Sequence, residues 1–132
     1  MKHREIRAAV LSALKANITE QVTWFDGRPA FIDELELPAV AVYLTDASSA
    51  DEFVDEDTWE AVLHIEVFLR AKETDSALDT WMEEKIFPAM DGVPGLGALL
   101  LKMNLQGYDY RRDDEFMMWG SADLRWNITY EM

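Results

Sequence analysis

Apolar and polar residues alternate most regularly in two long stretches of the chain. Residues 58–70 and 119–131 place apolar side chains at every second position, a period of two that is typical of β-strands with one buried face. Residues 39–45 are instead almost continuously apolar and rich in valine, which predicts a central strand buried on both faces. Shorter strands are predicted at 22–26 and 104–112, the latter followed by a hairpin loop at 112–118.

Helical periodicity appears in three other segments. Residues 3–16 place apolar side chains at intervals of three and four along one stripe, as expected for a helix packed on a core. A second helix is expected to begin near Asp75, its predicted N-cap. Pro88 should kink or end this helix, because proline has no N–H to donate. A short apolar helix is expected at 96–103.

The order of these segments indicates an α+β fold in one domain, residues 1–132, with helices packed on one face of a mainly antiparallel or mixed sheet. Residues 29–37 are expected to be irregular, with Phe31 and Ile32 turned inward, and 46–57 to form an acidic loop. The polar positions of the two long strands are expected to face outward; they are Glu60, His64, Glu66, Arg70, Asp123, Arg125, Asn127 and Thr129.

Charge adds a second pattern to this outline. The net charge is −14, so the chain is expected to bind no nucleic acid specifically. Lys and Arg are absent between Arg28 and Arg70, where eleven acidic residues fall. Lysine and arginine are instead frequent in the first fifteen residues. This asymmetry serves either solubility alone or oriented contacts between copies of the chain.

The residues that usually carry catalysis are missing. There are no cysteines and two histidines, His3 and His64, and no glycine loop or nucleophile elbow is present. His64 is expected to be a hydrogen-bonded sheet residue. The chain is therefore expected to have no enzymatic activity. Since no signal peptide or apolar run of about 20 residues is present, we expect a soluble, intracellular protein without membrane contact.

Carboxylates at the start of the second helix suggest a weak Mg²⁺ site. Glu73, Asp75 and Asp79 lie close in sequence, and Mg²⁺ is often held by one or two carboxylates and water. A cation here would relieve repulsion where subunits meet, although the protein requires no cofactor. Alternatively, Asp75 only caps the helix and Asp79 interacts with its dipole.

Five tryptophans and seven methionines are more than the core of so small a domain needs. Core packing accounts for most of them, and Trp and Tyr are enriched at protein interfaces. The surplus therefore indicates contact with a partner.

Several segments together resemble one known family. They are MKH-x-x-x-RAAVL at the start, FDGRPA at 25–30, PAVAVYLT at 38–45, DTW at 57–59, LHIEVFL at 63–69, GYDYRRDD at 107–114, and SADL and ITYEM near the end. In these the chain resembles the minor tail protein U family of lambda-type siphophages, the tail terminators. The resemblance spans the whole chain and weakens around 46–56, 96–106 and 115–119.

This resemblance implies a structural function in the virion. Family members assemble as a hexameric ring on the finished tail tube, stop the addition of major tail tube protein and provide the surface for the head-completion protein. The chain is therefore expected at the head-proximal end of the tail, after assembly in the host cytoplasm. It is expected to be monomeric in dilute solution, and DNA is expected to pass through the ring.

A ring requires two different surfaces that fit each other. Arg4 and Arg7 on one side, and Asp55 and Asp57 on the other, are candidates for such a contact. A hairpin contact with the tube or a neighbour is a further candidate, carried by Arg111 and Arg112. Two other functions stay open: another neck or head-completion protein, and an acidic inhibitor that mimics DNA to block a host factor.

Overall fold

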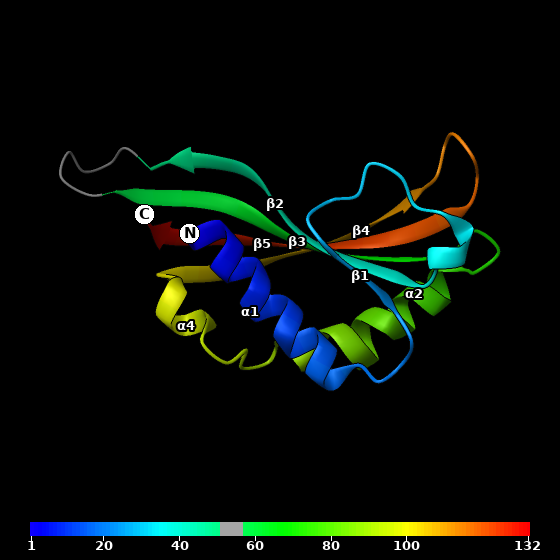
Figure 1. Ribbon diagram of the computed structural model, residues 1–132, viewed down its shortest axis with the longest axis horizontal. Coiled ribbons are helices and arrows are strands. Elements are labelled where there is room, and N and C mark those ends of the chain that lie inside the picture. The colour runs from blue at the N-terminus through cyan, green and yellow to red at the C-terminus, as the bar shows by residue number, and fades with distance from the viewer. Residues whose placement is uncertain (51–56) are drawn as a thin grey trace.

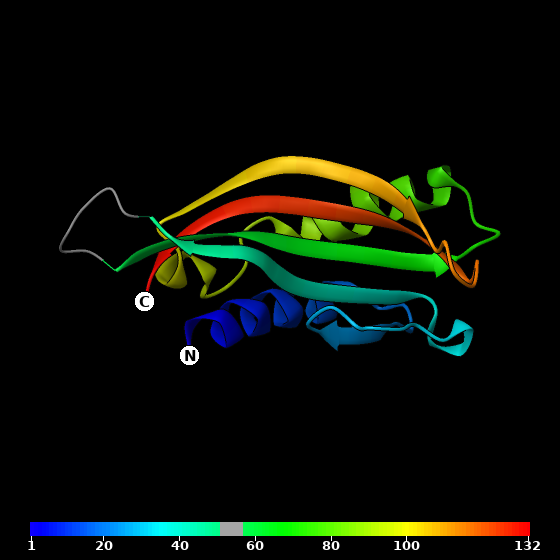
Figure 2. The same ribbon diagram turned by 90° about the horizontal axis from the view of Figure 1, so that it is seen from above.

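A single mixed sheet forms the framework of the protein, described by a computed structural model over residues 1–50 and 57–132. Its strands are β1 (Thr23–Asp26), β2 (Ala39–Ser49), β3 (Thr58–Arg70), β4 (Lys102–Arg112) and β5 (Trp119–Glu131). They are ordered β1-β2-β3-β5-β4, as Figure 2 shows from above. β1 and β2 are parallel and every other pair is antiparallel. The predicted mixed sheet is confirmed.

The α-helices and the π-helical segment of the described chain cover the same face of this sheet (Figure 1). They are α1 (Lys2–Asn17), α2 (Asp75–Trp81), η2 (Met82–Ile86), α3 (Phe87–Met90) and α4 (Leu96–Leu99). The α+β class with helices on one face is therefore confirmed. No helix in the described residues is long and apolar enough to span a membrane.

The main core lies between the helices and the sheet. Ile6, Val10 and Leu14 on α1 are fully buried in one cluster with Leu63 and Ile65 of β3. Burying each such side chain stabilises the fold by about 1.5–3 kcal/mol. The stripe on α1 and the alternation in β3 were both visible in the sequence, because each has the period of its element.

A smaller core lies on the opposite face, over β2. Ile32 and Leu37, from the segment 27–37, are buried in it with Tyr43 and Phe68. The segment contains a short 3₁₀ turn, η1 (Glu34–Glu36), closed by a capping box between Asp33 and Glu36. Ile32 is buried as predicted, but the prediction for Phe31 was wrong, since 54% of this residue is exposed.

Strand ends differ from the prediction in two places. β2 continues to Ser49, where a loop was predicted after Thr45. Its pairing with β3 shifts in register between Thr45 and Ser48, and the strand continues beyond this irregularity. The predicted helix over 96–103 ends at Leu99, and β4 begins at Lys102. Because Lys102 and Met103 pair with β5, β4 begins earlier in the sequence than its own apolar pattern indicates.

The second helix also differs in detail. Its N-cap is Thr74, and Asp75 is the first helical residue. The interruption predicted from Pro88 takes the form of a π-helical segment, Met82–Ile86, immediately before it. A π turn accommodates the missing N–H without ending the helix, so the helical course continues to Met90.

Candidate functional site

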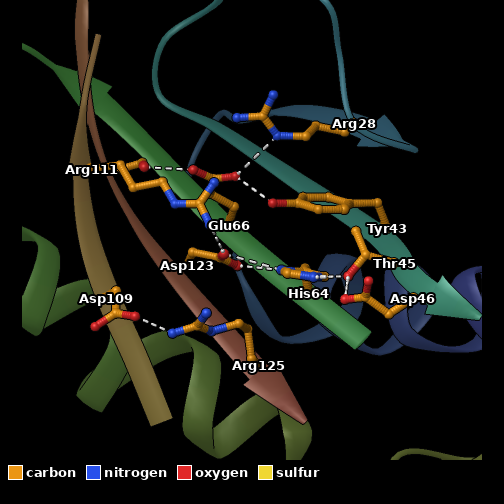
Figure 3. Close-up of polar contacts among 11 residues, drawn as sticks. Arg28, Tyr43, Thr45, Asp46, His64, Glu66, Asp109, Arg111, Asp123 and Arg125 are labelled. Carbon is orange, nitrogen blue, oxygen red and sulfur yellow. Dashed lines mark hydrogen bonds and ion pairs between the residues drawn. The ribbon is translucent and has the colours of Figure 1, made fainter. Parts of the chain in front are cut away.

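Two carboxylates are fully buried at the centre of the sheet. Glu66 on β3 and Asp123 on β5 have no exposed surface and lie opposite each other in register. Their side chains were predicted to face solvent, and for these two residues that prediction was wrong. The polar face of β3 and β5 is covered here by Arg28 and Arg111, which come from other parts of the chain (Figure 3). Because a buried charge without a partner is very costly, the contacts around them matter.

Glu66 accepts hydrogen bonds from two hydroxyl groups. The Tyr43 hydroxyl donates to Oε1 at 2.7 Å and the Ser121 hydroxyl to Oε2 at 2.6 Å. The Arg28 guanidinium lies 3.8 Å from Oε1 and supplies the opposite charge. Burial, and then the Glu66 charge, raise the pKa of Tyr43 well above its ordinary value. Tyr43 therefore stays a neutral donor to the carboxylate.

Asp123 is held by a cation on one side and an imidazole on the other. Arg111 Nη2 lies 3.1 Å from Oδ2, and His64 Nδ1 lies 2.9 Å from Oδ1. His64 Nε2 is in turn 2.6 Å from the Thr45 hydroxyl, and its ring stacks on Tyr43 with centroids 4.4 Å apart. The prediction that His64 is a hydrogen-bonded sheet residue is confirmed.

The buried carboxylates thus connect several strands of the sheet with the segment that carries Arg28. Through them β3 and β5 bind β2, β4 and the segment that carries Arg28 (Figure 3). Both arginines remain partly exposed, by 45% for Arg28 and 42% for Arg111. The network therefore fixes two cationic groups at the surface of the face that the helices leave uncovered.

A second polar cluster joins α2 to β4. Asp79 accepts hydrogen bonds from the hydroxyls of Tyr108, at 2.7 Å, and Tyr110. The bond from Tyr110, and then that from Tyr108, lower the pKa of Asp79 below its ordinary value. Arg112 Nη2 forms an ion pair with Asp75 at 2.7 Å. Three of the predicted interface residues, on α2 and β4, are therefore brought together.

Arg112 reaches α2 by crossing the neighbouring strand above Gly120. A Cβ at Gly120 would collide with the Arg112 guanidinium, so a residue without a side chain leaves the space that Arg112 occupies. Arg112 also donates to the carbonyl of Glu73 at 3.3 Å. This crossing could not be predicted from the sequence, because it depends on the register of β4 against β5.

The cationic residues predicted on α1 have separate positions. Arg7 forms an ion pair with Asp26 of β1 at 2.6 Å, whereas Arg4 is exposed. Asp57 is exposed directly before β3, and Asp55 lies outside the described residues. Their contact with a neighbouring subunit stays a prediction.

The start of α1 and the acidic strand ends lie at the same end of the molecule. His3 Nε2 is 2.6 Å from the Tyr130 hydroxyl on β5, and the next residue of β5 is opposite Thr58. The N-terminus, the C-terminus and the start of β3 accordingly share one end in Figure 1. The opposite end holds the β4–β5 hairpin with Arg111 and Arg112.

The carboxylates predicted to hold Mg²⁺ have other partners within the chain, since Asp75 pairs with Arg112 and Asp79 accepts from two tyrosines. Across the residues that the structure describes, no three His, Cys, Asp or Glu side chains are grouped closely enough to hold a metal ion. Binding of Mg²⁺ by these carboxylates stays a prediction.

Comparison with known proteins gives consistent matches over the full length. The family model described as phage minor tail protein U matches residues 1–130. The chain is 58% identical over 132 residues to the tail tube terminator protein of Escherichia phage lambda, with all of both chains covered. It is 54% identical over 132 residues to that of Escherichia phage N15, again with complete coverage. These matches include every helix and strand described above.

Proposed function

Because this chain belongs to the phage minor tail protein U family, we propose that it is a tail terminator that forms a hexameric ring on the completed tail tube. There it stops tube polymerisation and provides the surface to which the head is joined. The observation that carries this proposal is the identity of 54% and 58%, without unmatched regions, to two proteins named tail tube terminator.

The arrangement of charged side chains supports a function through surfaces and not through catalysis. Each buried carboxylate is paired with an arginine of the same chain; Glu66 also accepts from two hydroxyl groups and Asp123 contacts His64, as in a structural network. Its partners in the proposal are other copies of itself, the major tail tube protein and a head-completion protein. The protein is then assembled in the host cytoplasm, becomes part of the virion tail and lets DNA pass through the ring.

Addition of the purified protein to growing tail tubes tests this proposal. We expect tube elongation to stop and one ring to be visible at a single end of each tube by electron microscopy. A head-completion protein would bind heads and leave tube growth unchanged. An acidic inhibitor of a host factor would bind neither, and continued elongation at saturating protein would contradict the terminator function.

The carboxylates of α2 lead to a prediction about Mg²⁺. If Asp75 and Asp79 contribute part of a cation site that a neighbouring subunit completes, Mg²⁺ should promote association of the wild-type chain. Asp75→Ala should then remove this dependence in sedimentation experiments, while Asp91→Ala, at another exposed carboxylate, should retain it. Association of Asp75→Ala that still responds fully to Mg²⁺ would exclude the site.

A further inference from the structure

Large apolar side chains are exposed together at the end of the molecule that carries the β4–β5 hairpin. Phe31 and Phe116 are 54% and 58% exposed, and their rings meet edge to face with centroids 5.9 Å apart. Met117 is 78% exposed on the same hairpin, and Leu35 91% on the segment of Phe31. Isolated exposed apolar residues are ordinary, but a cluster of them indicates an interaction surface.

A hollow of about 500 Å³ lies beside this aromatic pair. It combines three guanidinium groups with three aromatic rings, contributed by Arg28, Arg111, Arg112, Phe31, Phe116 and Trp119, and it is also lined by Asp113, Asp114 and Glu115 of the hairpin tip. Arginine and aromatic residues are the types that contribute most to binding at protein interfaces. Backbone N–H groups of the hairpin already donate to the Asp113 carboxylate. The guanidinium groups and the aromatic rings are therefore the parts of the hollow that fit the carboxylates and apolar groups of a ligand.

The cationic side of the hollow is held in place before any ligand binds. Arg28 and Arg111 are fixed by the buried Glu66 and Asp123, yet nearly half of each arginine remains exposed. A guanidinium has five N–H donors in a planar fork, so it can bind a second carboxylate from outside. Because these side chains are already ordered, binding costs less conformational entropy.

The aromatic side is also held in place, by the tip of the hairpin. Asp113 accepts hydrogen bonds from the backbone N–H groups of Glu115, Phe116 and Met118, at 3.0–3.2 Å. These bonds fold the tip so that Phe116 and Met117 stand exposed. The hollow is therefore a formed surface with fixed polar and apolar parts.

The opposite end of the same sheet offers complementary chemistry. Asp57, Glu60 and Glu131 are exposed there, and strand pairing places Thr58 opposite Glu131. Apolar surface accompanies these carboxylates, since Leu101 is 57% and Met132 47% exposed. We call the surface formed by these five residues the acidic end.

The distance between the two surfaces decides which molecule can join them. β5 runs from one end to the other over 13 residues, which at about 3.3 Å per residue corresponds to about 40 Å. A chain therefore cannot place its acidic end in its own hollow, whereas a second copy can. Such a contact joins different surfaces of each copy and repeats head to tail, as rings require.

We propose that the hollow between Phe31, Phe116 and the arginines is the docking site for the acidic end of a second copy of this chain. This docking site rests on the proposed ring and names the surfaces that form it. The aromatic pair contacts the apolar residues of the acidic end, and Arg28 and Arg111 bind its carboxylates.

Removal of the aromatic pair tests the apolar half of the site. Under conditions in which the wild-type chain associates, Phe31→Ala with Phe116→Ala should weaken association about tenfold or more in analytical ultracentrifugation. Both side chains are more than half exposed, so the monomer should still fold. Leu105→Ala is the matched control, because Leu105 is 56% exposed and lies on β4 away from the residues that line the hollow.

Charge reversal of the acidic end tests the other half. Glu60→Lys with Glu131→Lys should also prevent assembly, whereas Glu83→Lys with Glu84→Lys makes the same change of charge at exposed sites on η2 and should not. The two defective proteins each retain one intact surface. Their equimolar mixture should therefore form dimers and nothing larger.

Several results would overturn this docking site. One is a mixture without dimers, and another is a Phe31→Ala, Phe116→Ala protein that assembles like the wild type. Loss of assembly in Arg4→Glu but not in the phenylalanine variant would place the contact on α1. A wild-type chain that never associates, even on tail tubes, would contradict the ring as well. Failure of the docking site alone can therefore be distinguished from failure of the proposed ring.

Discussion

Glu66 and Asp123 show at the scale of single residues how a buried charge is accommodated. Each carboxylate is fully buried and is neutralised by an arginine that comes from outside β3 and β5. In sequence, both stand at polar positions of alternating strands, where solvent exposure is the ordinary expectation. The pattern correctly predicts which face they are on. It does not predict their burial, because Arg28 and Arg111 reach them only in the folded sheet.

Removing the charge of Asp123 should be destabilising. Asp123→Asn removes the buried charge that Arg111 and His64 contact; since Arg111 is 42% exposed and can be solvated, the loss should be about 1.5–3 kcal/mol, as for a hydrogen bond to a charged group. Urea unfolding should show a loss of this size in the free energy of unfolding. The control is Asp109→Asn, whose carboxylate is 65% exposed where it pairs with Arg125 and which should cost about 1 kcal/mol or less. Equal effects of the two variants would contradict the network.

Asp113 gives a prediction about pH. Backbone N–H groups, that of Met118 first, lower the pKa of this carboxyl below its ordinary value. A lowered pKa in the folded state contributes stability above the unfolded pKa, and this stability is lost as the pH falls through the folded pKa. Asp113→Asn should therefore be less stable than the wild type near pH 7, and the difference should disappear as the pH falls through the lowered pKa of Asp113. Urea unfolding across this range measures it, and a difference independent of pH would refute it.

At the scale of elements, local periodicity predicted the elements better than their ends. The long strands and α1 follow their own apolar patterns, whereas β4 is mostly exposed and exists because β5 supplies its hydrogen bonds. The extension of β2 to Ser49 likewise depends on pairing with β3. The aromatic hollow could not be predicted from local sequence either. Phe31 and Phe116 are far apart in sequence and meet only when the hairpin and the segment 27–37 fold.

Substitution of Gly107 tests the backbone conformation of β4. It lies where the register of β4 shifts against β5, with φ +131°, a conformation that residues with a side chain rarely adopt. Gly107→Ala should therefore destabilise the protein by about 1–3 kcal/mol. Gly97→Ala is the control, because Gly97 lies in α4 without a positive φ and with open space around it; it should be neutral or slightly stabilising. Thermal unfolding distinguishes the two, and a neutral Gly107→Ala would contradict the described backbone.

At the scale of the whole molecule, charge and shape together suggest directional assembly. The two ends of the sheet differ: Asp57, Glu60 and Glu131 are exposed at one, and the other has an aromatic hollow lined by arginines and by the acidic residues of the hairpin tip. The uneven charge was apparent from the sequence, but its position relative to the β4–β5 hairpin required the fold. The motif resemblance identified the family, which the full-length matches confirm.

Salt should weaken association between copies if opposite charges meet in the contact. Screening reduces interactions between exposed charges, with a Debye length of about 10 Å at 0.1 M and about 3 Å at 1 M. Sedimentation at increasing NaCl concentration should show a progressive loss of assembled protein. Association that is unchanged between about 0.1 and 1 M NaCl would count against charged contacts at the subunit interface.

We propose that this chain acts as a ring-forming subunit at the end of the tail tube. Native mass measurement tests it most directly, on the protein with and without Mg²⁺ and on protein released from tail tubes by mild dissociation. We predict a species of six times the subunit mass, favoured by high concentration, by Mg²⁺ and by the tube. A chain that is monomeric under all these conditions, including on tubes, would contradict the claim.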